Sequence, residues 1–177
     1  MRKLLLIATF SLLIAVQSGQ GQKSGDIDAT AQFIWELREQ VRISSDSSDN
    51  DANSFEIGII DNLELEKAIA ALTGDMLDKK NDVVVSACSY DDDLAAFDLV
   101  YFATEDLEKL AALLKMVNGK PVITVTDTKG YARYGVMFEL FIKDGRAAYE
   151  MNKSVMRRAG LEPSEKLVEG ASKTYGR

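Results

Sequence analysis

The sequence predicts an α/β fold: a mainly parallel sheet flanked by helices, with a C-terminal antiparallel hairpin. Three observations support this prediction. Short apolar runs alternate with amphipathic helical segments, as in parallel strands joined by crossover helices. The apolar runs at 83–87 and 99–103 are continuous rather than alternating, as in strands covered on both faces. An Asp-Gly pair at 144–145 separates two further strand-like segments, and this dipeptide favours a two-residue hairpin turn.

The N-terminus has the layout of a secretory signal. Two basic residues precede a 13-residue apolar run at 4–16, which is followed by the small and polar segment QSGQGQKSG. A membrane-spanning helix needs about 20 apolar residues, so this run is too short to be one. Cleavage fits after Ser18 or Gly21, and an uncleaved membrane anchor is the alternative. We therefore expect a signal peptide at 1–20, a single domain at 21–177, and a periplasmic protein with no membrane insertion once the leader is cleaved.

Composition excludes several classes of function. Without its leader the chain carries 19 basic and 28 acidic side chains, a formal charge of −9, and such a surface repels nucleic-acid phosphates. There is no histidine, which excludes Ser-His-Asp and Cys-His catalysis and histidine metal sites. No phosphate-binding glycine motif is present. We predict a protein that is not an enzyme and has no cofactor or metal.

Cys88 is the single cysteine, so no intramolecular disulfide can form. Because it lies inside the apolar run VVVSACSY, we expect a buried thiol that packs as a small apolar residue. An intermolecular disulfide is the alternative.

The N-terminal half is expected to begin with a helix over 28–43, where apolar residues recur at helical spacing. The segment 44–53 has no large apolar side chain, which indicates an acidic loop. A strand at 55–60 and a helix from 61 to about 72, ended by Gly74, follow.

The next strands are expected at 83–87, 99–103 and 121–126. Between the first two, Asp91–Asp93 is expected to form a turn and a helix start rather than a catalytic carboxylate pair. Thr104 is the expected N-terminal cap of a helix that ends at Asn118-Gly119.

The hairpin predicts which residues face outward. If Lys143 lies opposite Arg146, then Val136, Phe138, Leu140 and Ile142 share an apolar, core-facing side with Ala147, Tyr149 and Met151. The other side places Glu139 opposite Glu150, a like-charge pair that costs stability unless a neighbouring group relieves it. Its mixture of aromatic and charged residues is typical of a partner contact, and a solvated outer face is the alternative. The partner-binding candidates are Met137, Glu139, Phe141, Lys143, Arg146 and Glu150.

A second candidate is the loop that follows the strand at 121–126, because α/β domains bind ligands at the carboxyl ends of parallel strands. Asp127, Tyr131 and Arg133 are the ligand-binding candidates: the tyrosine could stack on a ligand and the arginine could pair with an anion. The alternative is a loop that only turns the chain back into the sheet.

The stretch from Lys120 to Leu161 combines four motifs: a Thr-Val-Thr-Asp strand end at 124–127, a Gly-Tyr-Ala loop at 130–132, an Asp-Gly-Arg hairpin at 144–146, and an Asn before Arg-Arg-Ala-Gly-Leu at 157–161. In these motifs and their order the chain resembles the YfiR family. The resemblance covers roughly residues 29–171.

That resemblance implies an exported regulator that binds and represses the sensor domain of an inner-membrane diguanylate cyclase, in cyclic-di-GMP signalling and biofilm control. It also implies an outer-membrane lipoprotein partner and a homodimer. Paired cysteines of the family are absent here. A periplasmic small-molecule binding module that serves a sensor kinase or transporter is the alternative function.

Overall fold

The structure is a computed structural model and describes residues 24–43, 54–75 and 83–176. The expected signal peptide at 1–20 and the expected acidic loop at 44–53 lie outside the described residues. None of the helices in the described part of the chain is both long and apolar enough to cross a membrane.

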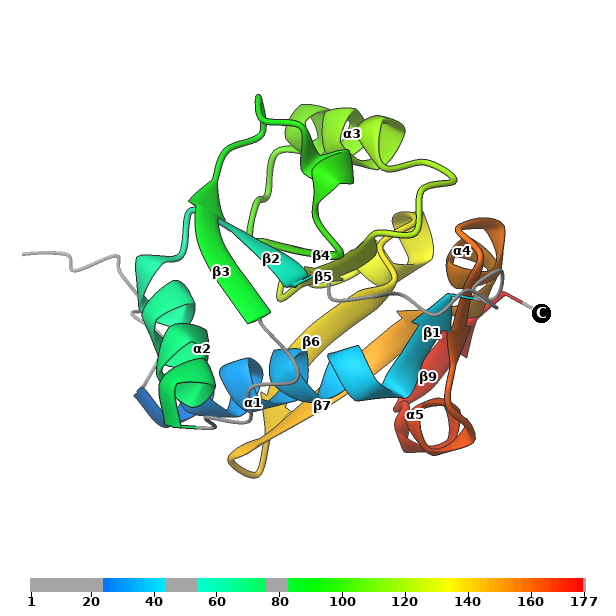
Figure 1. Cartoon of the computed structure of the whole chain (residues 1–177). Coiled ribbons are helices and arrows are strands. Elements are labelled where there is room, and N and C mark those ends of the chain that lie inside the picture. The colour runs from blue at the N-terminus through cyan, green and yellow to red at the C-terminus, as the bar shows by residue number, and fades with distance from the viewer. Residues whose placement is uncertain (1–23, 44–53, 76–82, 177) are drawn as a thin grey trace, which may run out of the picture.

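A seven-stranded sheet in the order β3-β2-β4-β5-β6-β7-β9 confirms the predicted fold class (Figure 1). Strands β3 to β6 of this order run parallel to one another, β6 and β7 form the antiparallel hairpin, and β9 joins β7 in parallel. The strands are β2 (Phe55–Ile60), β3 (Val83–Cys88), β4 (Leu99–Phe102), β5 (Ile123–Thr126), β6 (Phe138–Lys143), β7 (Arg146–Asn152) and β9 (Lys173–Tyr175).

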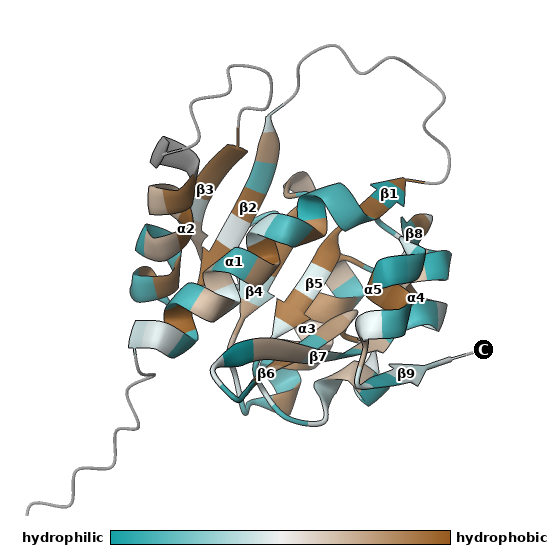
Figure 2. Cartoon of the chain, turned by 90° about the horizontal axis from the view of Figure 1, so that it is seen from below, coloured by the Kyte–Doolittle hydropathy of each residue, from teal (hydrophilic) through white to brown (hydrophobic). Residues whose placement is uncertain are grey.

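Helices cover both faces of this sheet. On one face lie α1 (Ser24–Gln40) and α2 (Leu63–Asp75), and on the other lies α3 (Leu107–Met116). The strands are largely hydrophobic where the helices cover them, and the outer sides of α1, α4 and α5 are hydrophilic (Figure 2). The short α4 (Lys153–Arg158) and α5 (Glu165–Gly170) follow the hairpin.

The helix expected over 28–43 ends early. Its last three residues form β1 (Val41–Ile43), which pairs antiparallel with β8 (Leu161–Pro163). Pairing with a segment so distant in sequence is what overrides the local helical pattern here.

Helix α3 begins two residues later than expected, so Thr104 does not cap it. The Asp106 carboxylate accepts hydrogen bonds from the Glu108 and Lys109 backbone nitrogens, at 2.8 and 3.2 Å, and is the N-terminal cap. The Thr104 hydroxyl instead accepts from the Asp106 nitrogen.

The turn expected at Asp91–Asp93 is confirmed. The Asp92 carboxylate accepts from the Ser89 nitrogen at 2.7 Å, and the Asp93 carboxylate caps a short 3-10 helix at Leu94–Ala96. These two carboxylates therefore serve local backbone structure.

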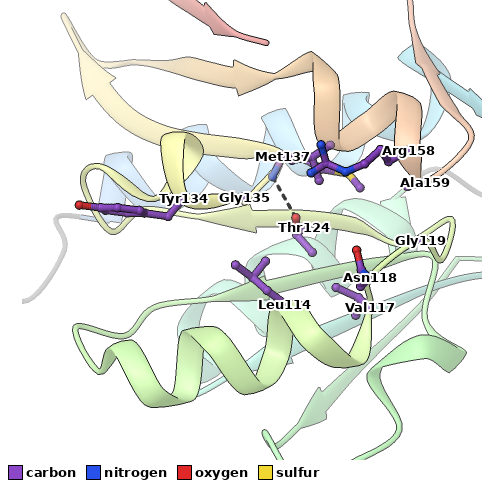
Figure 3. A pocket seen from close by; sticks show the side chains of 11 residues that line it. Leu114, Val117, Asn118, Gly119, Thr124, Tyr134, Gly135, Met137, Arg158 and Ala159 are labelled. Atoms are coloured by element: carbon purple, nitrogen blue, oxygen red, sulfur yellow. Dashed lines mark hydrogen bonds between the residues drawn. The ribbon is translucent and has the colours of Figure 1, made fainter.

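The hairpin register is confirmed, with Lys143 opposite Arg146 and Glu139 opposite Glu150. Met137 was expected on the outward side, and that expectation is wrong. Strand β6 begins only at Phe138, so the alternation of faces does not extend back to Met137. Its backbone nitrogen donates to the Thr124 hydroxyl at 2.9 Å (Figure 3), and its side chain packs in the core on the α1 side. Val136 packs in the other core cluster, on the α3 side.

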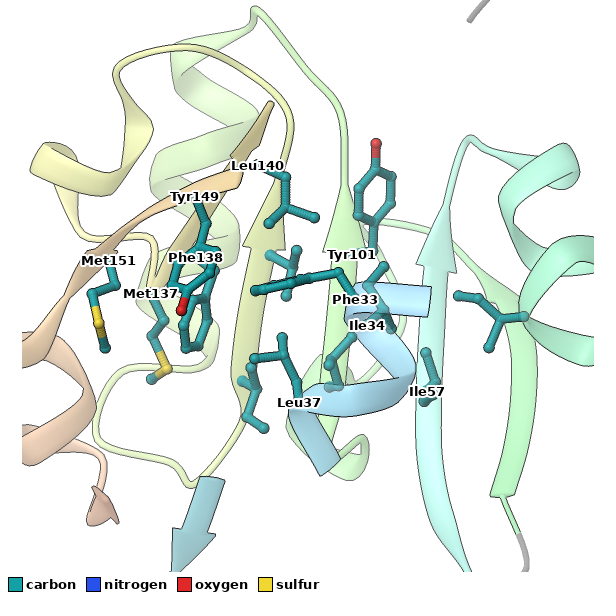
Figure 4. Close-up of a cluster of buried hydrophobic side chains, with 14 of the residues drawn as sticks. Phe33, Ile34, Leu37, Ile57, Tyr101, Met137, Phe138, Leu140, Tyr149 and Met151 are labelled. Atoms are coloured by element: carbon teal, nitrogen blue, oxygen red, sulfur yellow. The ribbon is translucent and has the colours of Figure 1, made fainter. Parts of the chain in front are cut away.

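The larger core cluster lies between α1 and the sheet. Three aromatic rings meet there, with the Phe33 centroid 4.7 Å from Tyr149 and 6.2 Å from Phe138. Ile34 and Leu37 of α1 are fully buried beside them (Figure 4). Edge-on and tilted ring contacts of this kind add about 0.5–1.5 kcal/mol each beyond burial.

Cys88 lies at the end of β3 and is half-buried. Its sulfur is close to Gly58 on the neighbouring strand. Burial raises the thiol pKa from 9.0 to about 11, with smaller contributions from the charges of Asp92 and Asp61. The thiol therefore stays protonated at neutral pH and is a poor nucleophile.

Candidate functional site

The six residues predicted to bind a partner fall into two groups. Met137 and Glu139 are buried. The outward side of the hairpin keeps four of them at least partly accessible: Phe141, Lys143, Arg146 and Glu150. We call these four residues the hairpin strip.

Glu139 has a structural role that its sequence position does not indicate. It is only 5% exposed, and its carboxylate accepts a hydrogen bond from the backbone nitrogen of Ala132 at 3.0 Å. Ala132 belongs to a 3-10 turn, η2 (Tyr131–Tyr134), which packs over the start of β6. Glu139 therefore fixes this turn to the sheet and is not free to contact a partner.

The expected repulsion between Glu139 and Glu150 is relieved by separate partners. The Tyr175 hydroxyl donates to the Glu150 carboxylate at 2.6 Å, and Lys173 lies opposite Glu150 in the β7–β9 register. Both partners come from β9, which the sequence analysis did not predict.

Phe141 is the exposed aromatic residue of the hairpin strip, with 38% of its surface accessible. Ala148 lies opposite it in the register, and so small a neighbour leaves the ring uncovered. The ring lines a hollow of about 330 Å³ together with Asp127, Lys129, Glu139, Leu140 and Glu150. Three carboxylates and one ammonium thus surround an accessible aromatic ring.

The three predicted ligand-binding residues do not converge. Asp127 lines the hollow beside Phe141. Tyr131 is 5% exposed and packs in the core on the α3 side, where burial raises its hydroxyl pKa. Arg133 stacks on the exposed Tyr134, with 4.9 Å between the guanidinium carbon and the ring centroid, and donates to the Tyr134 hydroxyl at 3.1 Å. Tyr131 is therefore placed to anchor the η2 turn rather than to stack on a ligand.

Sequence reasoning missed two neighbours of this site. Lys129 follows Asp127 in the same loop and could have been included from its position alone. Lys173 lies with its ammonium 4.6 Å from the Tyr175 ring centroid, and contact with Tyr175 raises the lysine pKa. No local pattern predicts that the three-residue β9 joins the sheet next to β7.

A second hollow, of about 190 Å³, lies between the C-terminal ends of α3 and α4 (Figure 3). Its lining is polar and apolar in about equal parts, and the Thr124 oxygen within it already accepts from the Met137 backbone nitrogen. Asn118 and Arg158 are the remaining polar side chains near its rim, together with the Tyr134 ring edge.

In the described part of the chain, no group of three or more His, Cys, Asp or Glu residues is placed to hold a metal ion.

Comparison with known proteins gives a family and a fold. No curated protein matches the chain. A conserved domain protein from Vibrio cholerae has a similar structure, with a TM-score of 0.53 and 12% identity, over 84% of this chain and 60% of that one. An ABC domain from Streptococcus pneumoniae, solved with L-Trp, aligns with a TM-score of 0.45 and 11% identity over 67% of this chain and 54% of that one. This chain thus spans little more than half the length of either protein.

At such low identity the likeness to the Vibrio cholerae protein shows the fold alone. The sequence itself matches the model of a family described as YfiR/HmsC-like, over residues 28–172. Since that match covers well over half of the chain, with six of the seven strands of the sheet and the whole hairpin, the chain belongs to the YfiR/HmsC-like family.

Proposed function

We propose that this protein is a periplasmic regulator that binds the sensor domain of an inner-membrane diguanylate cyclase and holds the cyclase inactive, without catalysing a reaction itself. Family membership supports the class of function. The basic and apolar N-terminal segment supports export.

The hairpin strip is the proposed contact surface. The observation that carries this assignment is Phe141, an accessible aromatic ring on a regular strand beside an acidic hollow. Aromatic and arginine side chains contribute most of the binding energy in protein interfaces. Arg146, at the end of the same hairpin, lies next to the solvent-exposed Lys143 and extends the strip.

Repression would act by shifting a population. A regulator that binds the inactive conformation of the sensor more tightly than the active one moves the equilibrium by that difference in affinity. Almost complete switching requires a preference of about 10⁴-fold, or about 5.5 kcal/mol. A lipoprotein of the outer membrane that bound the same strip would release the cyclase by competition.

The test is the substitution Phe141→Asp, measured as binding of the purified protein to a purified cyclase sensor domain. Loss of an anchor residue costs about 2 kcal/mol or more, so binding should weaken about 30-fold or more. Val84→Asp is the matched control, because Val84 is 41% exposed on a strand at the opposite edge of the sheet.

Val84→Asp should change the dissociation constant by less than about threefold, and both variants should keep the wild-type circular dichroism spectrum. If the wild-type protein binds the sensor and Phe141→Asp binds it equally well, the hairpin strip is not the contact surface. If the wild-type protein binds no cyclase sensor and does not lower cyclase activity, the proposed function itself is wrong.

A further inference from the structure

The outward face of the β6–β7 hairpin is ordered by charge along its length. Three cross-strand pairs make up this face, and the two members of each pair are alike in character: Glu139 with Glu150, Phe141 with Ala148, and Lys143 with Arg146. Because the acidic and the basic pair are four residues apart along an extended strand, they are separated by about 14 Å. The face therefore has an acidic end, an uncharged middle with one aromatic ring, and a basic end.

The stability of the hairpin does not explain this order. Like charges directly opposite each other destabilise a sheet, and both ends of the face carry such a pair. At the acidic end two uncharged donors, the Ala132 nitrogen and the Tyr175 hydroxyl, bond the carboxylates. At the basic end, neither Lys143 nor Arg146 forms an ion pair with a residue that the structure describes. The fold gains nothing from placing two cations there.

The groups around each end leave the two ends opposite in sign. Three carboxylates and the Lys129 ammonium line the hollow at the acidic end, and Lys173 lies opposite Glu150, so negative charges still outnumber positive ones there. At the basic end the turn residue Asp144 offsets only one of the two cations. Glu36 of α1 lines another hollow together with Arg146, but the two form no ion pair.

This separation of charge determines what kind of partner surface fits the face. Interfaces place charges of opposite sign against each other. The hollow at the acidic end has Phe141 and Leu140 in its wall together with the carboxylates, which suits a side chain with a long apolar stem and a cationic head. A cation is also attracted to the face of an aromatic ring. The basic end suits a carboxylate, with which Arg146 can form two parallel hydrogen bonds.

We propose that the cyclase sensor presents three groups in a fixed order to this face: a cationic side chain over the hollow, an apolar contact on Phe141, and a carboxylate against Lys143 and Arg146. The cation and the carboxylate of the partner lie about 14 Å apart, as the two charged pairs do. This inference rests on the proposed function and adds to it the chemistry and the orientation of the partner surface. A surface with the two charges in reverse order binds less tightly, because like charges then meet at both ends.

The experiment exchanges the two signs without changing the net charge of the protein. The double variant Lys143→Glu with Glu150→Lys retains Phe141, and it should bind the purified sensor domain about tenfold more weakly than the wild type or worse. The matched control is Glu64→Lys with Lys67→Glu. It exchanges two exposed charges on α2, which packs on β3 at the opposite edge of the sheet, and it should change the dissociation constant by less than about threefold.

Salt separates the contribution of charge from that of shape. The distance over which charges act in solution falls from about 10 Å at 0.1 M salt to about 3 Å at 1 M. The difference in affinity between the wild type and the exchange variant should therefore shrink to about threefold or less in 1 M sodium chloride. Phe141→Ala loses an apolar contact instead, so its deficit in affinity should persist at the higher salt concentration.

A second measurement avoids any change in folding. Glu150→Lys also removes the hydrogen bond from Tyr175, whereas Lys143 is exposed and its side chain makes no hydrogen bond or ion pair within the described part of the chain. Lys143→Glu alone should weaken binding of the sensor about threefold or more. Lys67→Glu makes the same change of net charge and should leave the affinity within about twofold of the wild type.

Three results would each overturn this inference. They are an exchange variant that binds the sensor as tightly as the wild type, a control exchange that weakens binding equally, and a difference that persists undiminished in 1 M salt. All three leave the proposed function standing, provided that the wild type binds the sensor and lowers cyclase activity. A wild-type protein that binds no sensor removes both the proposed function and the inference that rests on it.

Discussion

Replacing Glu139 by alanine should destabilise the protein, although glutamate on a hairpin strand would ordinarily be a tolerant surface position. The side chain is 5% exposed, and its carboxylate accepts from the Ala132 nitrogen. A hydrogen bond with a charged acceptor contributes about 1.5–3 kcal/mol, and a buried nitrogen left without an acceptor costs about 1–3 kcal/mol. These values describe the same bond from two sides, so we expect a loss of about 2 kcal/mol. Relief of the Glu150 charge opposite offsets part of it.

Two further variants, Glu139→Gln and Glu150→Ala, separate the loss of the hydrogen-bond acceptor for Ala132 from the loss of a negative charge. Glutamine retains an oxygen acceptor for Ala132 and removes the charge next to Glu150, so the loss should stay below about 1 kcal/mol. Glu150→Ala removes the hydrogen bond that the Tyr175 hydroxyl donates to the Glu150 carboxylate. Because Glu150 is less buried than Glu139, we expect the free energy of unfolding to fall by less than about 1 kcal/mol.

Urea denaturation of the mature protein, followed by circular dichroism, measures these differences as shifts of the midpoint at constant slope. For a chain of this length 1 kcal/mol corresponds to about 2–4 °C in melting temperature, so Glu139→Ala should melt about 4–8 °C lower. A Glu139→Ala variant as stable as Glu139→Gln would refute the reasoning, because the two differ in whether Ala132 keeps its acceptor.

Three further predictions test the packing around the site. Gly58→Ala would place a Cβ atom 2.9 Å from the Cys88 sulfur, so the free energy of unfolding measured in urea should fall by about 1–3 kcal/mol. Gly25→Ala is the control, because its Cβ atom meets nothing within 4 Å, and it should be neutral or stabilise the protein by about 0.5 kcal/mol. The Cys88 thiol should ionise near pH 11 in the folded protein by ultraviolet titration and near 9.0 when unfolded. Stability should therefore fall as the pH rises from 9 to about 11. Cys88→Ala should make that fall smaller without abolishing it, because burial also raises the pKa of Tyr131 and Tyr149. Tyr149→Phe should cost about 1–2 kcal/mol, because its hydroxyl donates to the Leu167 carbonyl at 2.7 Å in a buried place; an unchanged melting temperature would contradict this bond.

The parallel strands β2 to β5 could be predicted from the sequence because each of them is a largely apolar run. The strand predicted at 55–60 is observed as β2 with the same limits, and the run 83–87 differs from β3 by one residue. Strands covered on both faces, such as β4, must be apolar throughout, so a continuous run is both necessary and visible. The edge strand β3 has such a run too, but none of its residues is buried, so the expectation that it is covered on both faces is wrong. The hairpin register was predictable for a similar reason, since Asp144 and Gly145 both adopt the positive φ angles, 53° and 71°, that its turn requires.

Elements that depend on distant partners could not be predicted. Strands β1, β8 and β9 have three residues each, and their partners lie elsewhere in the chain. They are too short to show the alternating pattern of a strand in their sequence. They form because a neighbouring strand supplies the hydrogen-bond partners of their backbone groups. Glu139 illustrates the same limit at the candidate site. Its position on the outward side of the hairpin was predicted, but its burial comes from the η2 turn that packs over it.

The segment by which the family was recognised is a single hydrogen-bonded unit. Ala132 of the Gly-Tyr-Ala loop donates its nitrogen to Glu139, and its carbonyl accepts from the Asn152 amide at 2.7 Å. Asn152 also caps α4 by accepting from the Val155 nitrogen, and its backbone nitrogen donates to the Met137 carbonyl. One asparagine thus joins the loop, the hairpin and the helix that follows.

Within this segment, the residues that determine the fold differ from those that are available to contact a partner. Thr124, Tyr131, Ala132 and Asn152, which are among the residues that make the family recognisable, are buried within this unit, so what they specify is the fold. Contact with a partner must come from residues that this unit holds in place but does not use, and Phe141 and Lys143 are of that kind. Substituting Asn152 should therefore destroy binding together with stability, whereas substituting Phe141 should destroy binding alone. That difference makes the exposed ring, rather than the recognisable motif, the informative place to test function.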